Sequence, residues 1–431
     1  MSAGPGPDAG AVPRGSGATP RGAGGRVAGP GGAGGPARYV RPEVRALPVY
    51  RLDLAPVRHE LDQNEVPWDL PRRLKREVVR RLAAADWSTY PDFHADELRR
   101  ALGRRHGWPW EGVLVGNGSN ELLATALEAL AGPGTEVLGA DPSFGLYPAF
   151  VARPGGRYRP LPPRPDLRLP CAELAAEVAR DPHRPLLLCS PNNPTGDALA
   201  PERVAELAAA LDAPLLVDNA YGEFSRHDYR PLLARHPNLV LFRTFSKAWS
   251  LAGLRLGYLL AHPDLVAELL KVKLPYNLGH AGRAAGLVAL EAAEVAARRV
   301  AVLVGRRGQW AERLAAAGLE VFPSEANFLL VRCGAGEPGR AAARRLWDGL
   351  AARGVRVRDV GGYPGLAGCL RVSVGSGRAL RDVERALAEI AAEGGGTGAR
   401  DRERARKTRR EADLAGESSV RAAGSATGDD G

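Results

Sequence analysis

The sequence predicts an α/β fold, with a mostly parallel central sheet flanked by helices and followed by a smaller α+β domain. Short apolar runs alternate with amphipathic stretches between residues 113 and 260. Several of these runs are apolar at every position, which is typical of strands buried on both faces of a parallel sheet. The length of 431 residues also favours more than one domain.

The apolar and amphipathic segments predict strands and helices along the chain. Strands are expected at 113–115, 136–139, 186–189, 215–217, 239–242 and 256–260, with helices between them that begin near Ser119, Glu173 and Pro201. A long alanine-rich helical region covers roughly 282–317. Strands at 327–331, 355–358 and 369–373 and a helix at 338–353 then form the smaller domain. We therefore expect an N-terminal arm with part of the small domain at 38–72, a large domain at 73–285 and a C-terminal small domain at 286–393.

Both ends of the chain differ from this pattern. Residues 1–37 are almost entirely Gly, Ala, Pro, Arg and Ser, and residues 394–431 mix charges of both signs. Such segments bury too little apolar surface to offset the entropy of ordering, so we expect both to be disordered. There is no run of 18 apolar residues and no apolar signal core at the N-terminus, so we expect a cytoplasmic protein without a membrane span.

The charge and the cysteines give little support to nucleic-acid binding, a metal site or a disulfide framework. The formal net charge is +10, but no basic helix with interleaved aromatic residues supports nucleic-acid binding, and we assign the charge to an anionic small substrate or cofactor. Cys171, Cys189, Cys333 and Cys369 lack the spacing of a metal site or a disulfide framework. We expect reduced thiols and no metal.

The segment FSKAWSLAGLRLG at 245–257 carries the sharpest chemical signal. Lys247 follows a strand that looks buried, where an isolated charge is costly. An amine held neutral there can form a Schiff base with a carbonyl compound. Arg255 and the Ser246 hydroxyl can hold an anion in the same cleft. For a serine–lysine pair alone, an exposed loop at the end of a strand is the better explanation, and only the further segments below favour a Schiff base.

Three further segments follow apolar strands and give Lys247 its context. Asp218 ends one strand, at the edge where open α/β sheets bind ligands, and could keep a heterocyclic nitrogen protonated. Tyr221 offers a hydroxyl to a phenolic oxygen, and SPNNPTG at 190–196 offers a fixed amide. Gly116-Asn-Gly118-Ser119-Asn120 opens a helix whose N-terminus favours an anion, and Phe144 can stack on a ring. Together they describe a site for pyridoxal 5′-phosphate.

With these motifs, residues 39–390 resemble the fold-type I pyridoxal-phosphate aminotransferases, and among them the histidinol-phosphate aminotransferases. The most specific segments are SPNNPTG (190–196), VDNAY (217–221) and SKAWSLAGLRLG (246–257), supported by LDQNEVPWDLP (61–71), YPD (90–92) and PSEANFLLVR (323–332). The resemblance implies a homodimer with shared sites, in which residues 73–285 bind the cofactor. It also implies exchange of an amino group between glutamate/2-oxoglutarate and histidinol phosphate/imidazole-acetol phosphate.

The resemblance also implies a role for each site residue. Lys247 would bond covalently to the cofactor and carry the proton, Asp218 would pair with the ring nitrogen, and Tyr221 and Asn193 would bind O3′. Phe144 would stack on the ring, and the cofactor phosphate would be held by Ser119, Asn120, Ser246 and Arg255, with Tyr90 reaching in from a second subunit. Arg371 would bind the substrate carboxylate, and Arg358 and Tyr50 the substrate phosphate.

The sequence departs from the family in two places. Asn219 stands where the family usually has glutamate, and alternation along the strand predicts that it points away from the ligand, with little effect. Gln63, Val66 and Trp68 depart from an asparagine-rich segment near the expected substrate entrance. Alternatives left open are a broad or aromatic amino-acid aminotransferase, a threonine-phosphate decarboxylase, a pyridoxal-binding regulator without turnover and a nucleic-acid binder.

Overall fold

The computed structural model describes residues 35–47 and 56–393. Residues 35–47 fall in a unit of their own, with a 3-10 turn at Pro36–Tyr39 and the short helix α1 at Pro42–Arg45. All other elements belong to the second unit. The predicted disorder of residues 1–37 fails at its end, because Pro36 and Ala37 belong to the 3-10 turn. Residues 1–34 and 394–431, for which disorder was also predicted, and the predicted site residue Tyr50 lie outside the described residues.

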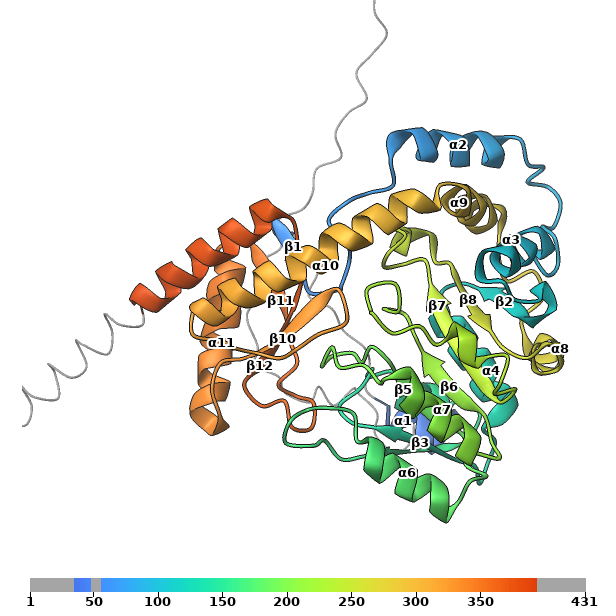
Figure 1. Cartoon of the computed structure of the whole chain (residues 1–431), viewed down its shortest axis with the longest axis horizontal. Helices are drawn as coiled ribbons and strands as arrows, with labels where there is room; N and C mark the ends of the chain where they lie inside the picture. The colour runs from blue at the N-terminus through green and yellow to red at the C-terminus, as the bar shows by residue number, and fades with distance from the viewer. Residues whose placement is uncertain (1–34, 48–55, 394–431) are drawn as a thin grey trace, which may run out of the picture. The chain divides into compact units, whose positions relative to one another are not determined.

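The larger sheet has seven strands in the order β2-β8-β7-β6-β5-β3-β4 (Figure 1). The strands from β4 through β3, β5 and β6 to β7 run parallel, whereas β8 is antiparallel to both β7 and β2. Their bounds are β2 Val113–Gly116, β3 Glu136–Ala140, β4 Arg157–Leu161, β5 Leu186–Cys189, β6 Leu215–Asp218, β7 Leu239–Thr244 and β8 Gly257–Leu260. The predicted α/β class with a mostly parallel sheet is confirmed.

Side chains from the central strands alternate between two cores, one on each face of this sheet. In β6, Leu215 and Val217 pack into one core and Leu216 into the other. Every residue of β2, β5, β6, β7 and β8 is buried, which explains why these runs are apolar without alternation. The helices of this part are α2 Arg72–Ala83, α3 Asp96–His106, α4 Ser119–Leu130, α5 Tyr147–Ala152, α6 Cys171–Arg180, α7 Pro201–Ala210, α8 Pro263–Val272 and α9 His280–Glu291, with 3-10 turns at Trp110–Gly112, Arg230–Leu232 and Ala252–Leu254.

The smaller sheet has five strands in the order β1-β11-β12-β10-β9. Its bounds are β1 His59–Leu61, β9 Glu320–Val321, β10 Phe328–Arg332, β11 Val355–Asp359 and β12 Cys369–Ser373, with α10 Ala293–Ala316, α11 Gly336–Ala352 and a helix over 377–393. Strand β1 pairs parallel with β11, although it precedes the large sheet in the chain. The chain therefore crosses from the small sheet to the large part between Leu61 and α2.

Two elements differ from the expectations. The helical region at 282–317 consists of α9 and α10, which meet at Ala292, whose φ of −111° and ψ of 36° lie outside the helical range. Strand β4 was not predicted, because RYRPL has no apolar run. It is an edge strand that pairs only with β3, so it needs few apolar residues and tolerates Pro160. No helix within 35–47 and 56–393 is long and apolar enough to cross a membrane.

Candidate active site

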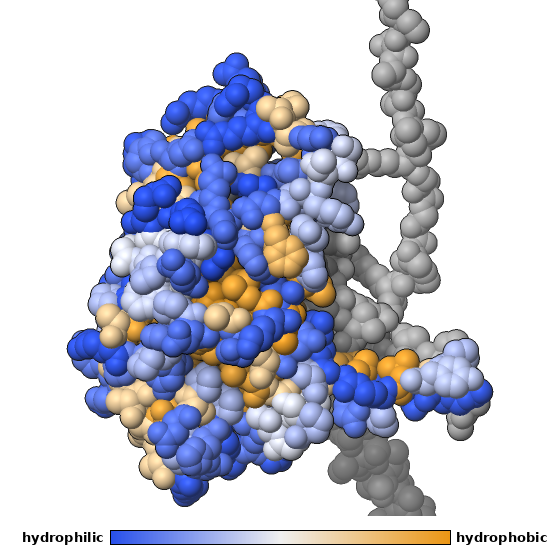
Figure 2. Space-filling view, turned by 90° about the vertical axis from the view of Figure 1, so that its right-hand side faces the viewer, coloured by the Kyte–Doolittle hydropathy of each residue, from blue (hydrophilic) through white to orange (hydrophobic). Residues whose placement is uncertain are grey.

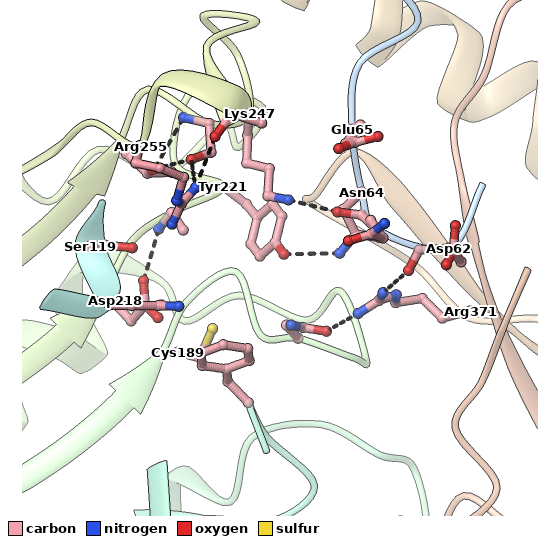
Figure 3. Close-up of a pocket in the computed structure, with 18 of the residues that line it drawn as sticks. Asp62, Asn64, Glu65, Ser119, Cys189, Asp218, Tyr221, Lys247, Arg255 and Arg371 are labelled. Carbon is pink, nitrogen blue, oxygen red and sulfur yellow. Dashed lines mark hydrogen bonds between the residues drawn. The ribbon is translucent and has the colours of Figure 1, made fainter. Parts of the chain in front are cut away.

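A pocket of about 380 Å³ lies where several strand ends of the large sheet face the small sheet (Figure 3). Strands β5, β6 and β7 are parallel and end at one edge, and β2 ends at the same edge because Gly116 and Thr244 both pair with Gly257. The predicted site residues that line the pocket are Ser119, Asn120, Phe144, Asn193, Asp218, Tyr221, Ser246, Lys247, Arg255 and Arg371. The topology thus gathers most of the predicted site.

Lys247 stands three residues beyond the end of β7. Its Nζ donates a hydrogen bond to the backbone oxygen of Gln63 at 2.7 Å. Burial lowers the pKa of this amine to about 8, and the charges of Arg371 and Arg255 act in the same direction, while Glu65 opposes them. A lysine with a pKa of about 8 is neutral in about a tenth of molecules at pH 7, far more than an ordinary lysine, and the neutral form is the nucleophile.

Asp218 is the last residue of β6 and is only 4% exposed. The hydroxyl of Tyr147 donates to its Oδ2 at 2.9 Å, and the backbone N–H of Ala220 donates to Oδ1 at 3.3 Å. Burial raises the pKa of this carboxyl to about 6, although both hydrogen bonds lower it. A cationic ring nitrogen in the pocket would stabilise the carboxylate form.

Tyr221 and Asn193 bring a hydroxyl and an amide to the same pocket. Tyr221 is buried, its hydroxyl oxygen accepts a hydrogen bond from Nδ2 of Asn64 at 2.9 Å, and its ring meets Phe328 edge to face. The Asn193 Oδ1 accepts from Arg371 at 2.5 Å. The neighbouring Asn192 points elsewhere, since its Nδ2 donates to Pro142 O and to Thr195 Oγ1, both at 2.9 Å.

Groups that could hold an anion lie in the same pocket as the amine. Helix α4 begins at Ser119 after Gly118, which makes no side-chain cap, so the first N–H groups of the helix remain available to an anion. Arg255 donates to Ser246 Oγ at 3.2 Å. A Cβ at Gly118 would lie 2.7 Å from the Arg255 guanidinium, and Gly118 has a φ of +83°. Glycine is therefore required for the guanidinium to approach the helix N-terminus.

On the small-sheet side, Arg371 in β12 reaches the pocket. Besides Asn193, its guanidinium donates to the backbone oxygen of Asp62. Arg358 in β11 pairs directly with Arg371, and residues opposite each other in an antiparallel pair point to the same face. Arg358 itself is not among the residues that line the pocket. The two arginines therefore lie next to each other, with Arg371 nearer the amine.

Tyr90 lies apart from the pocket of its own chain. Its side chain is 78% exposed and its ring stacks on Tyr276, with centroids 4.4 Å apart. The predicted role of Tyr90 in the site of a second subunit remains a prediction, as does the role of Tyr50.

Two parts of the site were not predicted from the sequence. The segment 62–65 lines the pocket and contacts Arg371, Lys247 and Tyr221, although the sequence predicted only that 61–71 lies near the entrance. Tyr147, which holds Asp218, was also missed. Its only sequence signal is its place three residues after Phe144, in the same loop-to-helix segment.

The family model "Aminotransferase class I and II" matches residues 59–390, which is more than half of the chain. The chain belongs to this family.

Relatives of this aminotransferase share both sequence and fold. It is 40% identical over 347 residues to the histidinol-phosphate aminotransferase of Methylibium petroleiphilum, covering 79% of this chain and 91% of that protein. It is 36% identical over 341 residues to that of Chlorobium phaeovibrioides, covering 78% and 93%. A crystal structure of histidinol-phosphate aminotransferase from Sinorhizobium meliloti in complex with pyridoxal-5′-phosphate matches with a TM-score of 0.73 and 27% identity, covering 82% of this chain and 98% of that one.

One departure from the family pattern has a structural role in this aminotransferase. Asn219 is buried and does not line the pocket, as alternation predicted. Its Nδ2 donates to Ser190 O at 2.6 Å and its Oδ1 accepts from Arg243 at 2.8 Å. Arg243 also forms an ion pair with Glu223 at 2.9 Å. The side chain thus ties the end of β6 to the SPNNPTG loop and to β7.

Proposed function

We propose that this aminotransferase uses pyridoxal 5′-phosphate and exchanges an amino group between glutamate/2-oxoglutarate and histidinol phosphate/imidazole-acetol phosphate, a step of histidine biosynthesis. One observation carries the proposal: a lysine with a lowered pKa, a buried aspartate and a group of residues able to hold an anion line one pocket. The names of the relatives supply the substrate pair.

The residues present fit this cofactor. The N-terminus of α4, Ser246 and Arg255 would take the phosphate, and Asp218 would take the pyridine nitrogen. Tyr221 and Asn193 would take the phenolic oxygen, and Phe144 would cover the ring. When bound, the cofactor supplies the electron sink for the reaction at the substrate Cα.

Lys247 and Asp218 would control protonation in opposite ways. Because the pKa of Lys247 is lowered to about 8, its amine can accept a proton and release it again near neutral pH. Burial makes the ionised form of Asp218 costly, and a positive charge beside the carboxylate would offset this cost. Asp218 would therefore hold a proton on the ring nitrogen.

The two arginines suggest how the substrates are oriented. Arg371 would bind the α-carboxylate that glutamate carries, and Arg358, beside it on the same sheet face, would bind the phosphate of histidinol phosphate. We propose that Tyr50 contributes to this phosphate site.

We further propose a homodimer in which Tyr90 completes the site of the partner subunit. Trp87, Tyr90 and Leu274 are 72%, 78% and 68% exposed, and Phe93 and Tyr276 beside Tyr90 are also exposed. Aromatic side chains exposed in such a group are typical of protein interfaces. Figure 2 shows one face of the molecule on which hydrophobic residues gather in patches among hydrophilic ones. All four cysteines are free, which fits the reducing cytoplasm that we propose as its location.

A substrate panel tests this proposal. Purified protein is loaded with pyridoxal 5′-phosphate, and transamination to 2-oxoglutarate is measured with histidinol phosphate, histidinol, aromatic amino acids and threonine phosphate. We expect the highest kcat/KM for histidinol phosphate, with histidinol far behind because it lacks the phosphate. A preference for aromatic amino acids, or release of CO₂ from threonine phosphate, would contradict the proposed substrate.

A further inference from the structure

Residues 62–65 line the pocket and lie in the segment that connects β1 with the large part of the chain. Asn64 is at their centre and is 1% exposed, and its φ of 55° lies in the left-handed region, which asparagine tolerates better than most residues. Figure 3 shows its side chain turned toward Tyr221, with Lys247 beside them.

Asn64 is fixed by hydrogen bonds to the small-sheet side. Its backbone N–H donates to Ser373 Oγ at 2.9 Å, and its backbone oxygen accepts from Asn327 Nδ2 at 2.9 Å. The Ser373 hydroxyl donates in turn to Oδ1 of Asn64 at 3.2 Å. The amide oxygen is therefore engaged on one side, and the amide nitrogen faces Tyr221.

This arrangement determines which way the Tyr221 hydroxyl can donate. An amide nitrogen has hydrogens to give and no lone pair to accept with, so the 2.9 Å contact makes the phenol oxygen the acceptor. Burial raises the pKa of Tyr221, so the hydroxyl keeps its single hydrogen. That hydrogen cannot point at Asn64 and is left to point elsewhere in the pocket that Tyr221 lines.

We propose that Asn64 is a positioning residue that turns the Tyr221 hydroxyl hydrogen into the pocket, toward the phenolic oxygen of the bound cofactor. The inference rests on the proposed function, because the cofactor supplies the acceptor. A donor at that oxygen stabilises its negative charge. This weakens the affinity for a proton of the nitrogen that joins the cofactor to the lysine. The absorbance of the bound cofactor reports this protonation, so the pH midpoint of the absorbance change is lowered.

Asn64→Asp reverses the polarity of this one contact. Aspartate has the same shape and also tolerates the left-handed backbone, but it presents only acceptors. Tyr221 would then donate to residue 64 and no longer to the cofactor. We expect the pH midpoint of the absorbance change to rise by about one pH unit or more, a tenfold or larger gain in proton affinity. Tyr221→Phe should give a similar rise, and no rise in Asn64→Asp would overturn the proposal.

The new carboxylate could also raise the midpoint through its charge alone, and a double variant separates the two effects. In the Tyr221→Phe background, Asn64→Asp should add little, because there is no hydroxyl left to turn. A full additional rise would show a through-space effect and overturn the proposal. Asn64→Gly, which fits the left-handed backbone without strain, removes the donor without adding charge. It should give a smaller rise that also disappears in the Tyr221→Phe background, and an unchanged midpoint would count against the proposal.

Asn327→Ala is the matched control for a purely structural role. Asn327 holds the same segment through the Asn64 backbone oxygen. Its loss should leave the midpoint unchanged, and a rise equal to that of Asn64→Asp would mean that the position of the segment, not the direction of the hydroxyl, is responsible. Failure of the proposed function is recognised separately: wild-type protein would then bind no pyridoxal 5′-phosphate and transfer no amino group.

Discussion

At the scale of single residues, burial explains why the pKa values of Lys247 and Asp218 differ from those of ordinary lysine and aspartate side chains. Lys247 and Asp218 are both buried, and burial moves their pKa values toward neutral pH from opposite sides, to about 8 and about 6. Neither shift can be read from a sequence motif, because each depends on side chains that come from distant parts of the chain.

The first prediction concerns Lys247. Lys247→Ala should abolish transamination, because the substitution removes both the covalent partner of the cofactor and the proton carrier. We expect the activity to fall by at least about 10⁴-fold. The variant should keep the circular dichroism spectrum of the wild type. Lys271→Ala is the control, since Lys271 is exposed and pairs with Glu268 on the surface of α8. Substantial turnover by Lys247→Ala would show that the assignment is wrong.

The second prediction separates the arginines. Arg358→Ala should raise KM for histidinol phosphate far more than for glutamate, because a charge-assisted contact to the phosphate is worth about 2–3 kcal/mol, or roughly 30- to 150-fold. Arg371→Ala should impair both half-reactions, and Arg371→Lys should rescue poorly, because a point charge cannot copy the planar fork. Stopped-flow measurement of each half-reaction distinguishes the two arginines. Equal damage to both halves from Arg358→Ala would refute a phosphate-specific role.

The third prediction is a pH dependence of stability without cofactor. Asp218 has its pKa raised from 3.8 to about 6, so between these values the folded protein binds more protons than the unfolded chain. Its contribution to the free energy of unfolding therefore falls as pH rises from about 4 to 6, by about 2–3 kcal/mol in total. Asp218→Asn should lose this slope in urea titrations of the cofactor-free protein. An unchanged slope between pH 4 and 6 would contradict the assigned pKa.

At the scale of elements, the site depends on how the ends of β6 and β7 are tied to the loops beside them. Asn219 and Arg243 form this connection, and both are buried. Asn219→Ala would leave Ser190 O and one Arg243 N–H without this partner, at a cost of about 1–3 kcal/mol. Urea unfolding should show this loss, whereas Arg203→Ala on the exposed face of α7 should change stability by less than about 0.5 kcal/mol. If Asn219→Ala leaves the free energy of unfolding unchanged, this connection contributes nothing to stability.

The elements also show what the sequence could and could not predict. The buried parallel strands β5, β6 and β7 are continuous apolar runs, so both the strands and the polar residues that follow them were predictable. Strand β4 and the three-residue β1 bury little surface and carry no such run. The contacts of Asn64, Tyr147 and Asp62 with the site join segments up to 309 residues apart, and no local pattern encodes them.

At the scale of the whole molecule, the proposed homodimer predicts complementation between two inactive variants. If Tyr90 acts in the partner's site, mixed dimers of Lys247→Ala and Tyr90→Ala chains contain one site with both substitutions and one with neither. Mixing the two proteins under exchange conditions should restore activity toward about a quarter of the wild-type value, because about half of the dimers are mixed and each has one intact site. Activity no greater than the sum of the separate variants would contradict shared sites.

Reductive labelling shows which lysine of this aminotransferase holds the cofactor. The cofactor-loaded protein is reduced with borohydride, which makes the link to the lysine permanent, and its peptides are mapped by mass spectrometry. The chain has only five lysines, Lys75, Lys247, Lys271, Lys273 and Lys407, so the assignment is unambiguous. Lys273 is an internal control, because it is also buried but lies outside the pocket. We expect the label on Lys247 alone; a label on another lysine, or none at all, would show that Lys247 does not hold the cofactor.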